Sequence, residues 1–80
     1  MTVTVLLFAS YADALRTDAL ELELPAGATV GDVVTHVQAM PGAARLPKNP
    51  LIAVNEHYVK RDRVIASGDE VAIIPPVAGG

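Results

Sequence analysis

The chain has 80 residues, a formal net charge of −3 and no cysteine. This length suits one domain, and the lack of cysteine excludes disulfides, thiolate metal sites and a cysteine nucleophile. Its apolar runs are shorter than the roughly 20 residues of a membrane span. The acidic balance argues against nucleic acid as a partner, because phosphate binding needs a clustered basic surface. The start lacks the basic region of a signal peptide, so we expect a cytoplasmic protein.

Five segments have the composition or the alternation of β-strands. The expected strands are residues 2–8, 20–24, 51–55, 57–60 and 71–75. The first and the last are apolar on both faces, so we expect them to lie side by side, in parallel, in the middle of a sheet. The second alternates leucine with glutamate, which favours a sheet edge. Turns are expected at Asn55–Glu56 and at Gly68–Asp69.

The clearest helix follows Thr29, which can act as the N-cap, with Asp32 three residues later. A stripe of apolar residues at helical spacing then predicts one buried face. Its members are Val30, Val33, Val34, Val37 and Met40. A second, short helical turn is expected from Ser10, an N-cap candidate, to about Leu15. One helix on a mixed sheet is an α+β arrangement, and it predicts a β-grasp, or ubiquitin-like, fold over residues 1–75.

A single helix can cover only one face of the predicted sheet. The apolar side chains that alternate toward the other face are those of Leu6, Phe8, Ala72 and Ile74. An exposed apolar patch of this kind marks a protein interaction surface. We therefore expect these four residues to form a partner interface near the exit of the C-terminal tail.

The domain itself offers few residues for chemistry. His36 and His57 are far apart in the sequence, and no closely spaced ligands predict a metal site. The serines and threonines have no evident base and orienting partner for a hydrolase triad. No glycine-rich stretch matches a phosphate-binding loop. We expect no bound metal or cofactor, and a solvated or structural role for both histidines.

The last five residues, 76–80, form a separate predicted tail. Pro75 and Pro76 cannot continue a strand ladder and favour a stiff, extended exit. Val77, Ala78 and Gly79 would follow as a thin chain that a narrow tunnel in a partner could accept. The carboxylate of Gly80, with a reference pKa of about 3.3–3.7, is ionised at neutral pH and must be activated before it reacts. A frayed, inert end is the alternative.

The run "SGDEVAIIPPVAGG" resembles the C-terminus of the small subunits of molybdopterin synthases, in the MoaD/ThiS family of ubiquitin-like sulfur carriers. The resemblance extends to "VTVLLFASYADALRTD", to the capped helix and to "LIAVNEHYV", so it covers nearly the whole chain. The Gly-Gly end is shared by all ubiquitin-like carriers, whereas the preceding Pro-Pro is more specific. The chain departs from the family in its proline-rich loop at 41–50 and at His57 and Tyr58.

The resemblance implies a sulfur carrier for molybdenum cofactor biosynthesis. The Gly80 carboxylate would be adenylated with ATP by a ubiquitin-activating-like adenylyltransferase and converted to a thiocarboxylate by a sulfur donor protein. The tail would then enter the large subunit of the synthase, where the sulfur passes to a cyclic pyranopterin. Two small and two large subunits would form the complex, with the catalytic groups on the large subunit. The lack of cysteine fits a carrier that holds sulfur on its terminal carbonyl.

Three other functions stay open at the level of sequence. The chain could carry sulfur for another pathway, such as thiazole, tRNA thiolation or cysteine synthesis. It could also be a ubiquitin-like modifier that is conjugated to lysines of target proteins. The third is a plain interaction domain whose end is inert.

Overall fold

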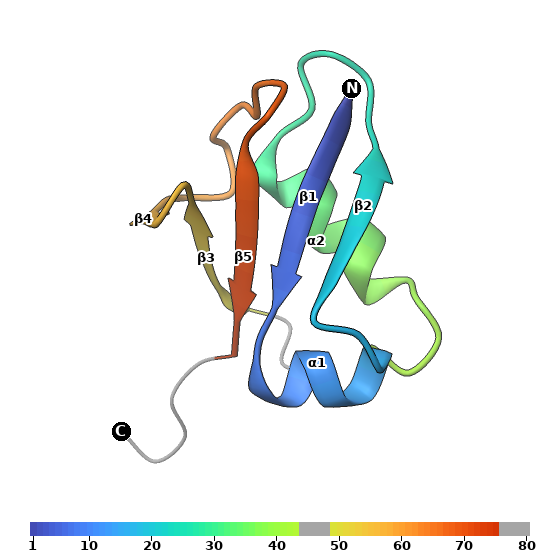
Figure 1. The fold of residues 1–80 in the computed structure, drawn as a ribbon. Helices are drawn as coiled ribbons and strands as arrows, with labels where there is room; N and C mark the ends of the chain where they lie inside the picture. The colour runs from blue at the N-terminus through green and yellow to red at the C-terminus, as the bar shows by residue number, and fades with distance from the viewer. Residues whose placement is uncertain (44–48, 76–80) are drawn as a thin grey trace.

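The computed structural model describes residues 1–43 and 49–75, and a five-stranded mixed sheet runs through this part of the chain (Figure 1). The elements in chain order are β1 (Thr2–Leu7), α1 (Ala9–Leu15), β2 (Ala19–Glu23), α2 (Val30–Gln38), β3 (Leu51–Val54), β4 (His57–Tyr58) and β5 (Glu70–Ile74). The strands lie in the order β2-β1-β5-β3-β4. β1 and β5 are parallel and the other pairs antiparallel. The predicted β-grasp arrangement, its central parallel pair and the edge position of β2 are confirmed.

Helix α2 covers one face of the sheet, and the core lies between them (Figure 1). Along β1 the side chains of Val3, Val5 and Leu7 are buried, whereas the side chains between them are only half-buried. The same alternation occurs in β5, where Val71 and Ile73 are buried. Each fully buried apolar side chain contributes about 1.5–3 kcal/mol to folding. Because buried side chains recur at every second residue, this alternation determines which face of each strand packs against the helix.

The start of α2 is built as the sequence predicts. The Thr29 hydroxyl accepts a hydrogen bond from the Asp32 backbone N–H at 3.4 Å, and the Asp32 carboxylate accepts one from the Thr29 N–H at 2.9 Å. These reciprocal bonds form a capping box. The predicted apolar stripe extends past the helix, because α2 stops at Gln38 and Met40 lies beyond it. The Met40 N–H bonds to the carbonyl of Val37, a tighter i to i+3 turn that closes the helix.

The start of α1 corrects the prediction that Ser10 is an N-cap. Phe8 occupies the N-cap position, and no side chain caps this helix. Burial of Tyr11 explains the difference, because its side chain is completely enclosed and draws the first turn against the core. Burial raises the pKa of the Tyr11 hydroxyl above its usual value, and a hydrogen bond with the Gln38 side chain opposes the shift. Tyr11 therefore anchors α1 to the end of α2.

Both predicted turns are present. Asn55 and Glu56 join β3 to β4 as a two-residue hairpin loop, and both have positive φ angles (50° and 73°). Gly68 supplies a positive φ of 88° in the turn before β5. The β4 strand is shorter than the predicted 57–60, and it forms the edge of the sheet opposite β2.

Candidate functional site

The chain leaves the sheet at the end where β1 and β5 both finish. Figure 1 shows these two strands parallel and ending at the same end of the sheet. Phe8 and Pro75 directly follow them in sequence, so both residues lie at that end. Pro75 is half-buried and is the last described residue. The predicted tail residues Pro76, Val77, Ala78, Gly79 and Gly80 lie outside the described residues, so their predicted roles and the domain boundary after Pro75 stay predictions.

The four residues predicted as a partner interface lie together on the sheet face opposite α2. Leu6 of β1 is directly paired with Ala72 of β5, and Phe8 and Ile74 follow toward the same end. All four line one groove of about 270 Å³. Leu6, Ala72 and Ile74 are half-buried, and 45% of Phe8 is exposed. Their role in binding a partner stays a prediction, but their expected position on one face is what the structure shows.

Four further residues line this groove that the sequence did not identify: Ala53, Glu56, Tyr58 and Glu70. We call the concavity formed by all eight the open-face groove. The antiparallel register puts Ala53 opposite both Ala72 and Tyr58, so one row of side chains crosses β1, β5, β3 and β4. Tyr58 is 71% exposed at the outer end of the row. The alternation within β3 and β4 could have suggested Ala53 and Tyr58, whereas their position beside Ala72 depends on the register.

A network of hydrogen bonds holds the segments that carry Glu56 and Glu70, the two acidic residues that line the groove, in position. The Asn55 side chain donates to the Asp69 carboxylate at 2.9 Å and accepts from the Glu70 N–H at 3.0 Å. The other Asp69 oxygen accepts from the Ala66 N–H at 2.9 Å. The Ala66 N–H, followed by the Asn55 amide, holds the pKa of Asp69 below its usual value. The hairpin that carries Glu56 is thereby fixed to the first residue of β5.

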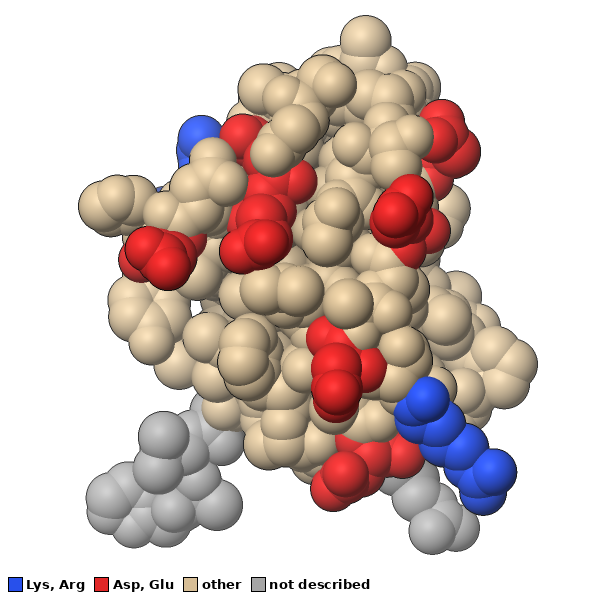
Figure 2. All heavy atoms as spheres, in the orientation of Figure 1, with Lys and Arg blue, Asp and Glu red and all other residues tan. Residues whose placement is uncertain are grey.

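The electrostatic character of this face is acidic. Figure 2 shows Asp and Glu side chains spread over it, while Lys and Arg are visible only near its margins. The cross-strand pairing places Glu21 of β2, Thr4 of β1 and Glu70 of β5 in one row next to the apolar one. Along β1 and β5, the row with Leu6 and Ala72 therefore lies nearer the exit of the chain than the row with Glu21 and Glu70.

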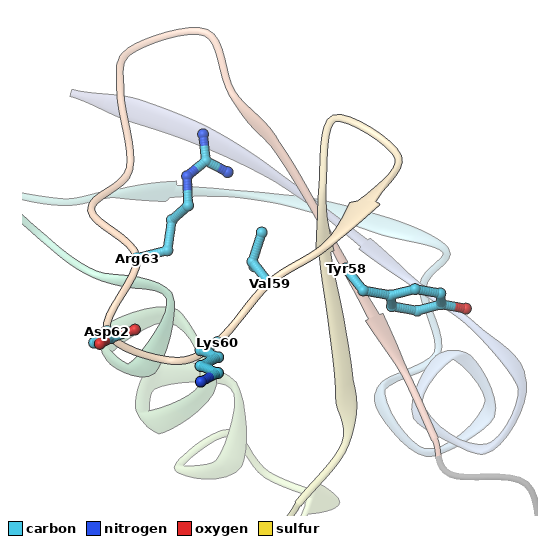
Figure 3. A pocket seen from close by; sticks show the side chains of 5 residues that line it. All are labelled: Tyr58, Val59, Lys60, Asp62 and Arg63. Carbon is cyan, nitrogen blue, oxygen red and sulfur yellow. The ribbon is translucent and has the colours of Figure 1, made fainter.

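A second, larger concavity of about 590 Å³ lies beside the segment that follows β4 (Figure 3). Its lining residues are Tyr58, Val59, Lys60, Asp62 and Arg63. The side chains of Lys60 and Arg63 point in different directions, and Tyr58 points away from the loop (Figure 3). Because these polar groups do not converge on one point, they do not form a ligand site of the usual kind. The open-face groove is the stronger candidate.

No metal or membrane element emerges from the described ranges. His36 and His57 are exposed, as expected. In residues 1–43 and 49–75, no group of three His, Cys, Asp or Glu side chains could hold a metal ion. None of the helices in those ranges has the length and apolar character needed to cross a membrane.

Comparisons with known proteins agree with this geometry. The ThiS family profile matches residues 5–80. The molybdopterin synthase sulfur carrier subunit of Drosophila melanogaster is 34% identical over 83 residues, covering 100% of this chain and 92% of the relative. A putative molybdopterin converting factor subunit 1 from Pyrococcus furiosus superimposes with a TM-score of 0.79 at 30% identity, over 96% of this chain and 99% of that one.

Another solved structure, the small archaeal modifier protein 1 of Methanosarcina acetivorans, gives a TM-score of 0.79 at 26% identity, over 99% of this chain and 96% of that one. The match to the family profile includes both the sheet that forms the open-face groove and the Gly-Gly end. This chain therefore belongs to the ThiS family of ubiquitin-like proteins.

Proposed function

We propose that this chain is the sulfur-carrying small subunit of a molybdopterin synthase, with sulfur held at the C-terminal carbonyl of Gly80. The observation that carries the proposal is the position of the chain's exit. The parallel pairing of β1 with β5 brings Pro75 out beside Phe8 and Ile74, at the apolar end of the open-face groove. A partner that docks on this groove would lie next to the segment that ends in Gly80.

The chemistry of the terminus sets the order of steps. A carboxylate resists nucleophiles, so the Gly80 carboxylate first attacks the α-phosphate of ATP on an activating enzyme and releases pyrophosphate. The terminal sulfur of a persulfide on a sulfur donor protein then displaces AMP and forms an acyl disulfide. A thiol reductant cleaves the sulfur–sulfur bond, which leaves the thiocarboxylate on Gly80 and the donor sulfur in a disulfide with that thiol. Transfer of the thiocarboxylate sulfur to the pyranopterin, with water cleaving the acyl–sulfur bond, regenerates the carboxylate. ATP is the co-reactant of the activating enzyme and not a ligand of this chain. We propose that the cycle takes place in the cytoplasm.

The proposed roles of the two subunits follow from the small number of reactive side chains in this domain. Within residues 1–43 and 49–75 the open-face groove offers apolar contact and two carboxylates, with no nucleophile and no metal site. The catalytic groups and the pterin site are therefore assigned to the large subunit. This chain acts as a docking surface that delivers a covalent reagent, in a complex of two small and two large subunits.

Mass spectrometry of the intact protein tests the proposal directly. The chain is incubated with its activating enzyme, ATP, a persulfide donor and a thiol reductant, and its mass should rise by the difference between sulfur and oxygen. Fragmentation should place the change on Gly80, and addition of the large subunit with cyclic pyranopterin should reverse it. A chain that binds these partners but never acquires sulfur at Gly80 would refute the proposal.

A second function, as a protein modifier, has the similarity to the small archaeal modifier protein in its favour. In that case Gly80 would form isopeptide bonds with lysines of other proteins. Trypsin cleaves after Arg63, the last basic residue of the chain, so peptides from a tryptic digest of cells that express the chain would then carry residues 64–80 linked through Gly80 to a lysine. Their absence, together with a thiocarboxylate on Gly80, separates the carrier from the modifier. Genes next to this one would separate the pterin pathway from the thiazole, tRNA and cysteine pathways.

A further inference from the structure

The open-face groove combines an apolar floor with two acidic walls. Leu6, Ala53, Ala72 and Ile74 form the floor, which offers room for an apolar side chain. Glu56 and Glu70 are the charged residues among the eight described residues that line the groove, and both glutamates are exposed. Phe8 and Tyr58 flank the groove with aromatic rings. A surface built in this way selects for charge as well as for apolar character.

Within residues 1–43 and 49–75, neither carboxylate forms an ion pair with a Lys or Arg side chain. The ion pair of the N-terminal ammonium with Glu23, at 3.9 Å, lies in the row of Thr2, away from the groove. Among the described residues that line the groove, none is Lys or Arg. Negative charges beside an apolar surface attract a cation, so a positively charged side chain that enters the groove can pair with these carboxylates.

We infer that the open-face groove binds a protein segment in which an arginine lies next to an apolar side chain. The apolar side chain would fill the floor of the groove, and the guanidinium would reach Glu56 and Glu70. The inference rests on the proposed function for the identity of the partner proteins, but the chemistry of the occupant follows from the groove alone. It assigns Glu56 and Glu70 a role in the choice of partner.

Arginine fits the site better than lysine for two reasons. Its planar guanidinium can donate two parallel hydrogen bonds to one carboxylate, and it stacks on aromatic rings. Tyr58 offers such a ring at the edge of the groove, with 71% of its surface exposed. A lysine ammonium is a compact, strongly hydrated charge that would gain less from the same surroundings.

The first test uses a model ligand and does not depend on the pathway. The full-length, isotope-labelled chain is titrated with the peptide acetyl-Arg-Leu-Arg-amide and, separately, with acetyl-Glu-Leu-Glu-amide. We expect the basic peptide to shift the amide signals of residues that line the groove at millimolar concentration, and the acidic peptide to leave them unchanged. Equal shifts with both peptides, or none with the basic one, would overturn the inference.

The second test measures the affinity of the full-length chain for the large subunit and for the activating enzyme. The Glu56→Gly variant removes one carboxylate at a position whose positive φ of 73° glycine adopts freely, so its melting temperature should be unchanged or higher. Glu70→Gln removes the other carboxylate. Each should weaken binding about three- to tenfold at low salt, and the loss should shrink as salt screens the charges.

Glu21→Gln is the matched control, because it changes the net charge equally on the same face but lies outside the groove. A loss as large as that of Glu70→Gln would show a general charge effect and contradict the inference. If the unmodified chain binds neither partner protein, the proposed function fails, and the peptide titration alone decides the role of the groove.

Discussion

Asn55 and Asp69, 14 residues apart in sequence, are joined by a hydrogen bond of 2.9 Å between their side chains. The bond connects the β3–β4 hairpin to the turn that precedes β5. Asn55 also bonds twice to the backbone of Glu70, through its side-chain oxygen and its own N–H. One asparagine and one aspartate thereby hold the two turns against each other. The positions of Glu56 and Glu70, which line the open-face groove, depend on these bonds.

Removal of the Asp69 carboxylate should destabilise the fold in a pH-dependent way. Asp69→Ala leaves the Ala66 N–H and the Asn55 amide without their acceptor, so we expect a loss of about 1 kcal/mol in the free energy of unfolding at pH 7. The folded pKa of Asp69 is lowered, so its contribution is complete above the unfolded pKa of about 3.9 and is lost as pH falls through the lower, folded value.

Urea unfolding at several pH values measures this contribution. The difference between the parent and Asp69→Ala should narrow in acid, below pH of about 4. Asp13→Ala, on the exposed surface of α1, serves as the control and should leave stability nearly unchanged. A constant difference between parent and Asp69→Ala across the whole pH range would contradict the assigned role of the carboxylate.

Gly42 should be the most sensitive of the glycines in the described turns. It has a φ of +93°, and a Cβ at this position would lie 2.6 Å from the carbonyl oxygen of Ala14 in α1. Gly27 has a similar φ of +89° but no atom within 4 Å of the added carbon. We expect Gly27→Ala to cost about 1 kcal/mol from backbone strain alone. Gly42→Ala should cost about 2–4 kcal/mol, because overpacking against backbone adds to the strain.

Thermal unfolding of both variants checks this comparison. Similar melting temperatures for Gly27→Ala and Gly42→Ala would show that the chain after α2 moves away from α1 without cost. A much lower value for Gly42→Ala would show that the two segments are packed rigidly against each other.

The fold was largely predictable because its signals are local or periodic. The alternation in residues 2–8 and 71–75 identified the central strands, and Thr29 with Asp32 identified the start of α2. The prediction that Ser10 is the N-cap of α1 was wrong because the capping pattern does not include Tyr11. Burial of Tyr11 sets the start of α1 through contacts with residues distant in sequence.

The groove was only half predictable for a similar reason. Side-chain alternation in the two central strands placed Leu6, Phe8, Ala72 and Ile74 on one face. That Glu56 and Tyr58 join them depends on how β3 pairs with β5 and β4. Long-range packing sets the register of β3 against β5, and no motif in "LIAVNEHYV" predicts it.

Phe8→Asp should separate partner binding from folding. Phe8 is 45% exposed at the edge of the open-face groove, so its replacement should lower the free energy of unfolding by about 1 kcal/mol or less. Affinity for the large subunit and for the activating enzyme should fall at least about tenfold, because the aromatic contact is lost and a third carboxylate is added to the groove. Calorimetric titration measures both affinities.

Val64→Asp is the matched control, since Val64 is a 58% exposed apolar residue that does not line the groove. It should leave both affinities unchanged. A Phe8→Asp chain that is unfolded at room temperature would instead assign Phe8 to the core. Equal weakening by both variants would show that the groove has no special part in binding.

The last prediction concerns the terminus that the proposed function requires. The buried core of the described residues contains nothing after Ile73, so Gly79→Ala and an extra alanine after Gly80 should not lower the melting temperature. Sulfur transfer should nevertheless fail in both variants. The methyl group of Gly79→Ala would widen a chain that must enter a narrow channel. The added residue would move the reactive carbonyl by about 3.3–3.6 Å, and a misplacement of about 1 Å can already cost on the order of 100-fold in rate.

Thiocarboxylate formation and sulfur transfer to the pyranopterin, followed by mass spectrometry, measure the two steps separately. Ala78→Gly is the control, because it keeps the chain length and adds no atom, and it should support both steps. An inert, frayed end predicts that all three variants behave like the parent. Normal sulfur transfer by the extended chain, with its extra alanine still attached, would exclude Gly80 as the sulfur-carrying residue, because the thiocarboxylate would then have formed on another carbonyl.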